Sequence, residues 1–148
     1  MRNVHSYDND SCIGLMDAQA DMFMFLSDEL AEVDTDAFIK EWLSSNTRAA
    51  LDDGSPKFLY KSGVELLSWF INQETKGQYP KGISEYKPHV LHWVGLMYQL
   101  YAYEEKIASA ELVKILPPDV LYSMYYPWHE LSDLGAVKRI KKYLEETS

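Results

Sequence analysis

The chain has 148 residues, of which 47% are apolar and 14% aromatic, and 23 acidic residues against 14 basic ones give a net charge of -9. This length predicts one globular domain with a sizeable hydrophobic core, and the acidic balance argues against general binding to nucleic-acid phosphates or anionic membranes. Cys12 is the only cysteine, which excludes an intrachain disulfide and a cysteine-based zinc site and favours a reducing, cytoplasmic location.

The N-terminal part of the chain holds almost all of the excess charge. Residues 1–36 contain nine acidic residues and one basic residue, a net charge of -8, whereas the rest of the chain is nearly balanced at -1. Residues 1–14 lack the apolar run of a secretory signal, and we expect them to be poorly ordered. The longest weakly charged stretch, residues 88–103, is too short for a bilayer span, so no transmembrane segment is expected.

The first predicted helix covers about residues 15–33 and is amphipathic. At 100° per residue its carboxylates fall within one narrow stripe, and large apolar side chains occupy the opposite arc. Met24 and Phe25 flank the acidic stripe, where either other helices cover them or they anchor a partner, since Met and aromatic residues are enriched at interfaces. The candidate partner-binding residues are Asp17, Asp21, Met24, Phe25, Asp28 and Glu32.

Two short helices are predicted next. Asp34 or Thr35 caps the first of them, and its apolar residues have the spacing i, i+1, i+4, i+5: Phe38, Ile39, Trp42 and Leu43. The second covers residues 48–51 and is closed by Asp52-Asp53-Gly54. Both are short enough to depend on packing against the rest of the chain.

A longer helical segment is predicted to begin at Ser55 and Pro56, because Ser supplies a capping oxygen and Pro suits the first helical position. It runs to a stop at residues 76–77, and Gly63 is a point where it could divide in two. Residues 77–87 contain a proline and glycines and are predicted to form a loop.

Pro88 begins the longest apolar helix, which covers about residues 88–103. Apolar side chains occupy most of its circumference, and the small or polar strip that remains consists of His92, Gly95, Gln99 and Ala102. A helix that is apolar almost all round has neighbours on most sides. We therefore place it at the centre of the fold.

Prolines divide the C-terminal part into three helices. Ser109 caps the first, Pro117-Pro118 end it and begin the second, and Pro127 stops the second. Ser132 or Asp133 caps the last. Strand-like alternation is absent, so the prediction is an all-α single compact domain of about six or seven helices around residues 88–103.

Histidines on the central helix are weak candidates for metal ligands. Glu85, His89 and His92 have the spacing i, i+4, i+7, which would align three ligands on a continuous helix. Pro88 interrupts that helix, however, and a single H-x-x-H pair carries little information. Histidines that form hydrogen bonds with their neighbours are the simpler interpretation, and no metal or other cofactor is predicted.

An aromatic turn near the C-terminus is a candidate ligand pocket, formed by Tyr122, Tyr125, Tyr126, Trp128 and His129. Tyr and Trp combine large contact area with a polar tip, which suits a pocket or an interface. Closure of the core by a proline-broken turn explains the same residues. His129 and Glu130 are adjacent, so on a helix they point about 100° apart and form a poor acid–base pair.

The last helix carries the one basic cluster of the sequence: Lys138, Arg139, Lys141 and Lys142. Such a helix could contact DNA. Glu145 and Glu146 follow at i+4 from the last two lysines and would partly neutralise them, so a solvated face is favoured.

The chain lacks the sequence signatures of the common enzyme classes. It has no glycine-rich phosphate loop, no G-x-S-x-G elbow and no H-E-x-x-H motif, and Cys12 lies in a polar segment without a basic neighbour. The Arg-x4-6-His pair of small helical ribonuclease toxins is also missing. We therefore predict a protein without enzymatic activity.

Three segments carry a resemblance to a known group of proteins: P-H-V-L-H-W-V-G-L-M-Y-Q-L-Y-A-Y (88–103), A-S-A-E-L-V-K-I-L (108–116) and Y-Y-P-W-H-E-L-S-D (125–133). Residues 55–140 resemble small helical proteins of gut bacteria, which share a W-[IV]-G-x-x-Y-x-x-[WY] helix, an S-x-E-[IL]-x-K-I segment and a Y-Y-x-[YW]-H-x-L-x turn. Trp128 and Ser132 occupy variable positions of the turn here, and Gln99 stands where a basic residue is commoner.

The resemblance implies a partner rather than a reaction. Some members of the group look like antitoxin-type partners of toxin-like gene products, and no catalytic residue is established for it. The leading hypothesis is a non-enzymatic interaction module of antitoxin-like type, whose acidic N-terminal helix binds a protein partner with a basic surface. The alternatives are a small-molecule or metal-binding domain and a DNA-binding autoregulator that uses the basic C-terminal helix.

Overall fold

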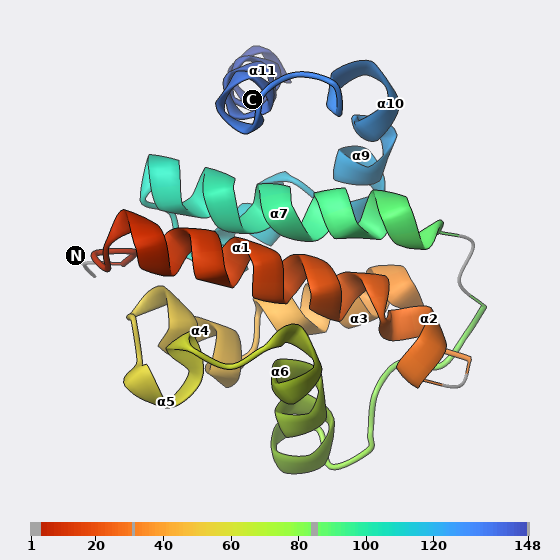
Figure 1. Ribbon diagram of the computed structural model, residues 1–148. Coiled ribbons are helices and arrows are strands. Elements are labelled where there is room, and N and C mark those ends of the chain that lie inside the picture. Colours follow the sequence, from red (N-terminus) through yellow and green to blue (C-terminus); the bar gives the residue numbers. More distant parts are fainter. Residues whose placement is uncertain (1–3, 31, 84–85, 148) are drawn as a thin grey trace.

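Two long helices, α1 (Asn9–Met24) and α7 (Pro88–Glu105), lie side by side and antiparallel at the centre of the molecule (Figure 1). The structure is a computed structural model and describes residues 4–30, 32–83 and 86–147. Over these residues the chain is all-α, with one isolated bridge between Val33 and Lys81 and no strand. The predicted fold class and the predicted central helix are confirmed.

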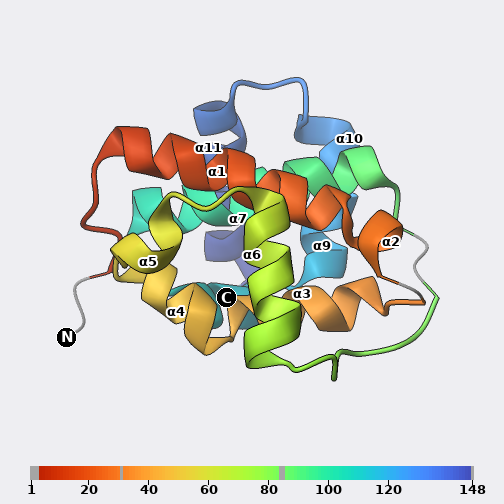
Figure 2. The same cartoon turned by 60° about the horizontal axis from the view of Figure 1, so that its bottom comes forward.

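The remaining helices cover the central pair. In the view of Figure 1, α2 extends the end of α1, α3 to α6 lie below the central pair and α9 to α11 lie above it. Helix α9 also contacts α3, and α8 contacts α7, α3 and α4. Helix α6 crosses α1 steeply (Figure 2). The bounds are α2 (Leu26–Glu29), α3 (Thr35–Leu43), α4 (Asn46–Asp52), α5 (Pro56–Leu59), α6 (Gly63–Trp69), α8 (Ser109–Ile115), α9 (Pro118–Ser123), α10 (Tyr125–Trp128) and α11 (Asp133–Thr147).

The small or polar strip of α7 forms the seam with α1. A Cβ atom at Gly95 would lie 2.7 Å from the carbonyl oxygen of Gln19, so a glycine is what lets the two backbones approach. The Gln19 side chain donates to the carbonyl of Gly95 at 2.8 Å and accepts from the Trp42 indole at 2.9 Å, which satisfies both ends of a buried amide. The strip therefore faces a close backbone contact between α1 and α7.

Replacing Gly95 tests this close approach. We expect Gly95→Ala to lower the free energy of unfolding by about 2 kcal/mol, because the added methyl group must push α1 and α7 apart. Gly14→Ala is the matched control on α1, where a Cβ would meet no atom within 4 Å. That change should stabilise by about 0.5–1 kcal/mol through helix propensity. Urea unfolding of both variants measures the difference, and equal effects would contradict the seam.

Several predicted helix ends are confirmed and others differ. The Asp34 side chain caps α3 by accepting from the amide of Ala37 at 3.1 Å. Pro88 and Pro118 each occupy the first turn of a helix, as predicted. Ser55 makes no side-chain cap; the segment divides before Gly63, where a capping box joins Ser62 and Glu65.

Two further predictions about helix ends were wrong. Ser109 is the first residue of α8 rather than its cap. Pro127 lies inside the short helix α10 and does not stop the preceding one, which ends at Ser123. The first turn of a helix tolerates proline because its N–H groups have no intrahelical partner there.

Helix α6 continues as a π-helical turn, Phe70–Glu74, in which the amide of Thr75 bonds to the carbonyl of Phe70 at 2.8 Å. Glu74 then reaches the start of α4, where its carboxylate accepts from the amides of Asn46 and Thr47 at 3.1 and 2.8 Å. Negative charge at a helix N-terminus is stabilising. The π turn thus connects α6 to α4, and no local sequence pattern predicts this connection.

The N-terminal residues are built into the core, which differs from the disorder that we expected for residues 1–14. Among residues 4–14, α1 begins at Asn9, and Val4, His5 and Cys12 are buried; residues 1–3 lie outside the described part. Apolar side chains from α1 through α11 form one continuous core. Within the described residues no helix combines the length and apolarity that a membrane span requires.

Candidate functional site

The six predicted partner-binding residues do not lie on one helix. Helix α1 ends at Met24, α2 is a separate turn, and Glu32 follows it with a left-handed backbone (φ 46°). The expectation of a single helix to residue 33 was therefore wrong. The bend lets both Leu26 and Val33 reach the core, where each is almost completely buried.

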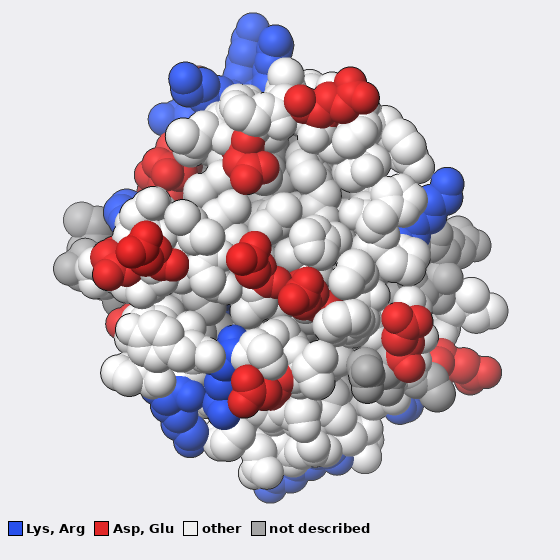
Figure 3. Space-filling model, in the orientation of Figure 1, with Lys and Arg blue, Asp and Glu red and all other residues white. Residues whose placement is uncertain are grey.

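The four predicted carboxylates, Asp17, Asp21, Asp28 and Glu32, lie on α1, on α2 and in the turn after α2, and we call this set the acidic face. Asp17, Asp28 and Glu32 are exposed, and among the described residues no Lys or Arg nitrogen lies within 4.0 Å of their carboxylates. Asp21 is half-buried and lies 3.6 Å from the imidazole of His92. Figure 3 shows acidic side chains spread over the side of the molecule that carries α1, with Lys and Arg mainly towards the margin.

Met24 and Phe25, the two predicted anchors, are half-buried. Phe25 packs against the hydrophobic core, so part of its ring is already used for folding. Both residues keep exposed surface at the bend between α1 and α2. The structure thus supports both interpretations in part: the fold covers these side chains incompletely, and they border the acidic face.

The aromatic turn forms a ring cluster around Tyr125. His129 stacks on this ring with centroids 4.1 Å apart and hydrogen-bonds through Nδ1 to the Tyr125 carbonyl at 2.7 Å. Trp93 and His89 meet the same ring edge-on. Tyr122 lies elsewhere, stacked on Tyr86 at 4.3 Å.

Most rings of this turn contact another ring or the core. Tyr126 is the member that remains mostly exposed, at 57%, although its edge meets Tyr125. Trp128 packs partly against the core. The candidate ligand pocket is therefore divided: Tyr125, Tyr126 and His129 form one surface cluster, whereas Trp128 packs against the core and Tyr122 pairs with Tyr86.

The weak candidates for metal ligands are not brought together. His89 is exposed and contacts Tyr125, whereas His92 faces Asp21 across the α1–α7 seam. Glu85 lies outside the described residues. Within the described residues no group of three or more His, Cys, Asp or Glu side chains is arranged to hold a metal ion.

The basic cluster of α11 is partly neutralised, as predicted. Lys141 forms an ion pair with Glu105 of α7 at 3.0 Å, and Lys142 lies 4.0 Å from Glu146. Lys138 and Arg139 are exposed. One of the four cations is therefore tied to the neighbouring helix rather than directed outward.

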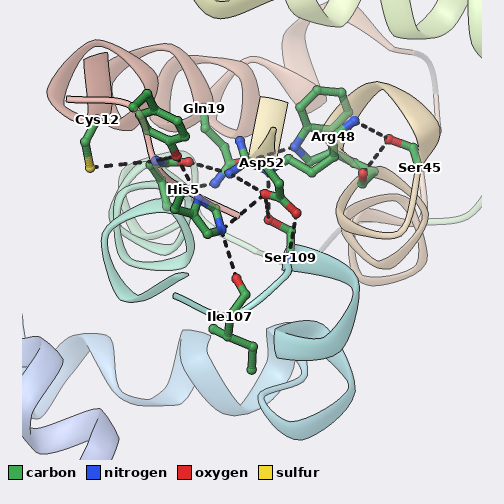
Figure 4. Close-up of polar contacts among 12 residues, drawn as sticks. His5, Cys12, Gln19, Ser45, Arg48, Asp52, Ile107 and Ser109 are labelled. Carbon is green, nitrogen blue, oxygen red and sulfur yellow. Dashed lines mark hydrogen bonds and ion pairs between the residues drawn. The ribbon is translucent and has the colours of Figure 1, made fainter. Parts of the chain in front are cut away.

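A buried polar cluster at the junction of α4, α7 and α8 was missed by sequence reasoning (Figure 4). Arg48 and Asp52 are each about 1% exposed and form an ion pair at 3.4 Å on the same face of α4. The Ser109 hydroxyl donates to Asp52 at 2.7 Å and accepts from Arg48 Nε at 2.9 Å. Arg48 also donates to the Gln99 amide oxygen. The i, i+4 spacing of Arg48 and Asp52 was the one available signal.

The N-terminal residues complete this cluster. His5 Nε2 lies 2.8 Å from the carbonyl of Ile107 and therefore carries the proton, while Nδ1 accepts from the Tyr7 hydroxyl at 2.8 Å. The Gln99 amide donates to the Tyr7 oxygen at 2.7 Å and contacts Cys12 Sγ at 3.7 Å. The hydrogen bonds thus connect the chain start to α1, α4, α7 and α8.

Burial shifts the titration of this cluster. It lowers the pKa of His5 to about 4, against the opposing effect of Asp52, and the cations Arg48 and Lys106 lower it further. Burial also raises the pKa of Tyr7 to about 12 and that of the Cys12 thiol above its usual range. At neutral pH the cluster therefore contains a neutral imidazole, a phenol, a thiol and one ion pair.

The arrangement has no activated nucleophile. Ser109 donates to a carboxylate and has no histidine base, and the Cys12 thiol stays protonated. Arg48 Nη1 is the one buried side-chain nitrogen or oxygen atom of the described residues without a hydrogen-bond partner. The cluster is a structural network inside the protein, and the acidic face remains the candidate site at the surface.

Comparison with protein-family models, with curated proteins and with solved structures found no match for this chain.

Proposed function

We propose that the chain is a protein–protein interaction module that binds a basic partner surface through the acidic face. The observation that carries this proposal is the set of exposed carboxylates on α1, α2 and the following turn that have no described cationic partner: Asp17, Asp28 and Glu32. Unpaired like charges on one face repel one another, and a partner of opposite charge relieves that repulsion while speeding encounter.

Met24 and Phe25 supply the apolar part of the proposed interface. Charged pairs at the edge of an interface mainly affect association rate, whereas buried apolar and aromatic anchors slow dissociation. The half-buried side chains at the α1–α2 bend border the acidic face and fit the second role. Residues 55–140 resemble a group of small helical proteins, some of which look like antitoxin-type partners, and this supports a toxin-like gene product as the binding protein.

Charge reversal tests the proposal. The chain is co-expressed with the products of its neighbouring genes, and the affinity of any co-purified pair is measured by calorimetry at two salt concentrations. Asp17→Lys with Asp28→Lys should weaken binding about tenfold, because two surface attractions of about 0.7 kcal/mol each are lost. The double variant should also reduce the salt dependence of binding.

Matched controls distinguish the effect of charge on the acidic face from the effect of the net charge of the chain. Glu41 and Glu130 are exposed acids outside the face, so their reversal to lysine changes total charge equally. This pair of changes should leave the affinity within a factor of two. Met24→Ser should raise the dissociation rate without loss of helicity. Equal weakening by both charge reversals, or an unchanged affinity in all variants, would contradict the proposed interface.

A further inference from the structure

The first described residues form a strap, residues 4–8, that is fastened at both of its edges. The amide of His5 donates to the Asp52 carbonyl at 2.7 Å, and Lys106 Nζ donates to the His5 carbonyl at 2.5 Å. The His5 side chain adds its bond to Ile107, and its backbone has the left-handed φ of 56° that non-glycine residues rarely adopt. The strap thus joins α4 to the C-terminal end of α7.

The strap covers part of the buried polar cluster. Tyr7 stacks obliquely on Tyr103 with ring centroids 5.4 Å apart, and its hydroxyl bonds to Gln99, the residue that also contacts Cys12. His5 lies between the Ile107 carbonyl and the Asp52 carboxylate, which is 3.4 Å from its Nε2. Removal of the strap would therefore expose the outer side of the Asp52–Ser109 contact and the surroundings of Cys12 (Figure 4).

The contacts of His5 match a neutral ring. Nε2 donates to Ile107 and Nδ1 accepts from Tyr7, so a second proton on Nδ1 would force the Tyr7 hydroxyl proton to turn away and lose its acceptor. The charged groups that face the ring are Asp52 and Arg48 from α4 and Lys106 from the end of α7. Asp52 is already paired with Arg48, so a buried imidazolium would meet one shared carboxylate and two cations.

We propose that the strap is an acid-sensitive latch: protonation of His5 releases residues 4–8 and uncovers the polar cluster beneath. The closed and open strap differ in the protonation of one imidazole, and this difference couples strap opening to pH. Arg48, Asp52 and Ser109 stay bonded to one another when the strap leaves, because none of their mutual contacts involves it. These three contacts therefore persist in the released state.

Two measurements on the full chain test the latch between pH 7 and pH 5. Deuterium uptake reports on the backbone of residues 4–8, corrected for the pH dependence of intrinsic exchange. The reaction of Cys12 with 4,4′-dithiodipyridine reports on what is uncovered, relative to a free peptide of residues 9–16. With a pKa of 6.5 for a free imidazole and about 4 in the closed strap, the opening equilibrium should increase about 20-fold. Both corrected rates should increase by that factor.

A non-titrating side chain separates the latch from general acid effects. Gln can keep the donor towards Ile107, so His5→Gln should remove the pH dependence of both rates, whatever their baseline. His129→Gln is the matched control on a histidine outside the strap and should keep the wild-type pH response. Local release also requires that the rates depend only weakly on urea, because little surface is exposed.

Three results would overturn the latch. The first is a corrected rate at residues 4–8 or at Cys12 that stays level from pH 7 to pH 5 in the wild type. The second is a pH response that persists in His5→Gln. The third is a urea dependence as steep as that of global unfolding, which would mean that acid opens the whole molecule rather than the strap.

Discussion

Replacing Arg48 by methionine should lower the free energy of unfolding by about 3–5 kcal/mol at pH 7. Arg48 and Asp52 are both buried, and removal of one partner leaves the other charge without compensation in the interior. Since a domain of this size is stable by only about 5–15 kcal/mol, the variant should lose a large share of its stability. Urea unfolding followed by circular dichroism measures the effect.

A double-mutant cycle separates the ion pair from its surroundings. Asp52→Asn keeps an oxygen for the Ser109 hydroxyl while it removes the charge. The double variant Arg48→Met with Asp52→Asn should then be more stable than the sum of the single effects predicts, by about 1–3 kcal/mol, because no charge stays buried.

An exposed pair provides the control for this cycle. Lys114 and Glu111 lie 3.2 Å apart on the surface of α8, and Lys114→Met should cost less than about 0.5 kcal/mol. If Arg48→Met lowered the free energy of unfolding as little as Lys114→Met, water would have access to the buried cluster. Simple additivity of the two buried substitutions would show that the pair is not coupled.

The sequence predicts the start of a helix well where the start depends on residues within one turn. The Asp34 cap and the prolines at positions 88 and 118 each act within one turn of the backbone, and the helices begin where these residues place them. The apolar circumference of residues 88–103 similarly predicts a helix with neighbours on most sides. Such features depend on residues that are close in sequence, so one chain is sufficient to recognise them.

Extrapolation of a helical period failed at the acidic face. Residues 15–33 keep their amphipathic pattern through the bend after Met24, and no Gly or Pro marks that bend. The chain turns because Leu26 and Val33 are buried in the core, a demand of tertiary packing. Asp28 and Glu32 nevertheless stay exposed, so they remain candidates for partner binding, but they follow a bend in the chain rather than a straight helical stripe.

The buried polar cluster could not be predicted for a different physical reason. Arg and Asp are almost never fully buried unless they are paired, so sequence alone favours a surface position for Arg48 and Asp52. Their interior partners lie far away in the chain: Ser109 is 57 positions after Asp52, and Gln99 is 51 positions after Arg48. Only the fold shows that these polar groups satisfy one another.

Acid should destabilise the whole protein through His5. The pKa of His5 is about 4 in the folded chain because of burial, against 6.5 for a free imidazole, so the folded state binds fewer protons between these values. The stabilisation associated with the neutral ring is complete above pH 6.5 and is lost as the pH falls towards 4. The loss should reach up to about 3 kcal/mol at pH 4, at 1.36 kcal/mol per unit of pKa difference, and release of the strap, which frees the imidazole, limits the loss to the free energy of opening the strap.

The comparison of wild type with His5→Gln isolates this term from the carboxylates that also titrate in acid. Both proteins contain the same Asp and Glu residues, so their contributions cancel in the difference between the two unfolding curves. Measured at pH 7 and at pH 4, the gap in stability should move by up to about 3 kcal/mol in favour of the glutamine variant. A gap that is the same at both pH values would mean that His5 binds a proton in the folded protein as readily as in the unfolded chain, and that its burial between Asp52 and Ile107 imposes no electrostatic cost.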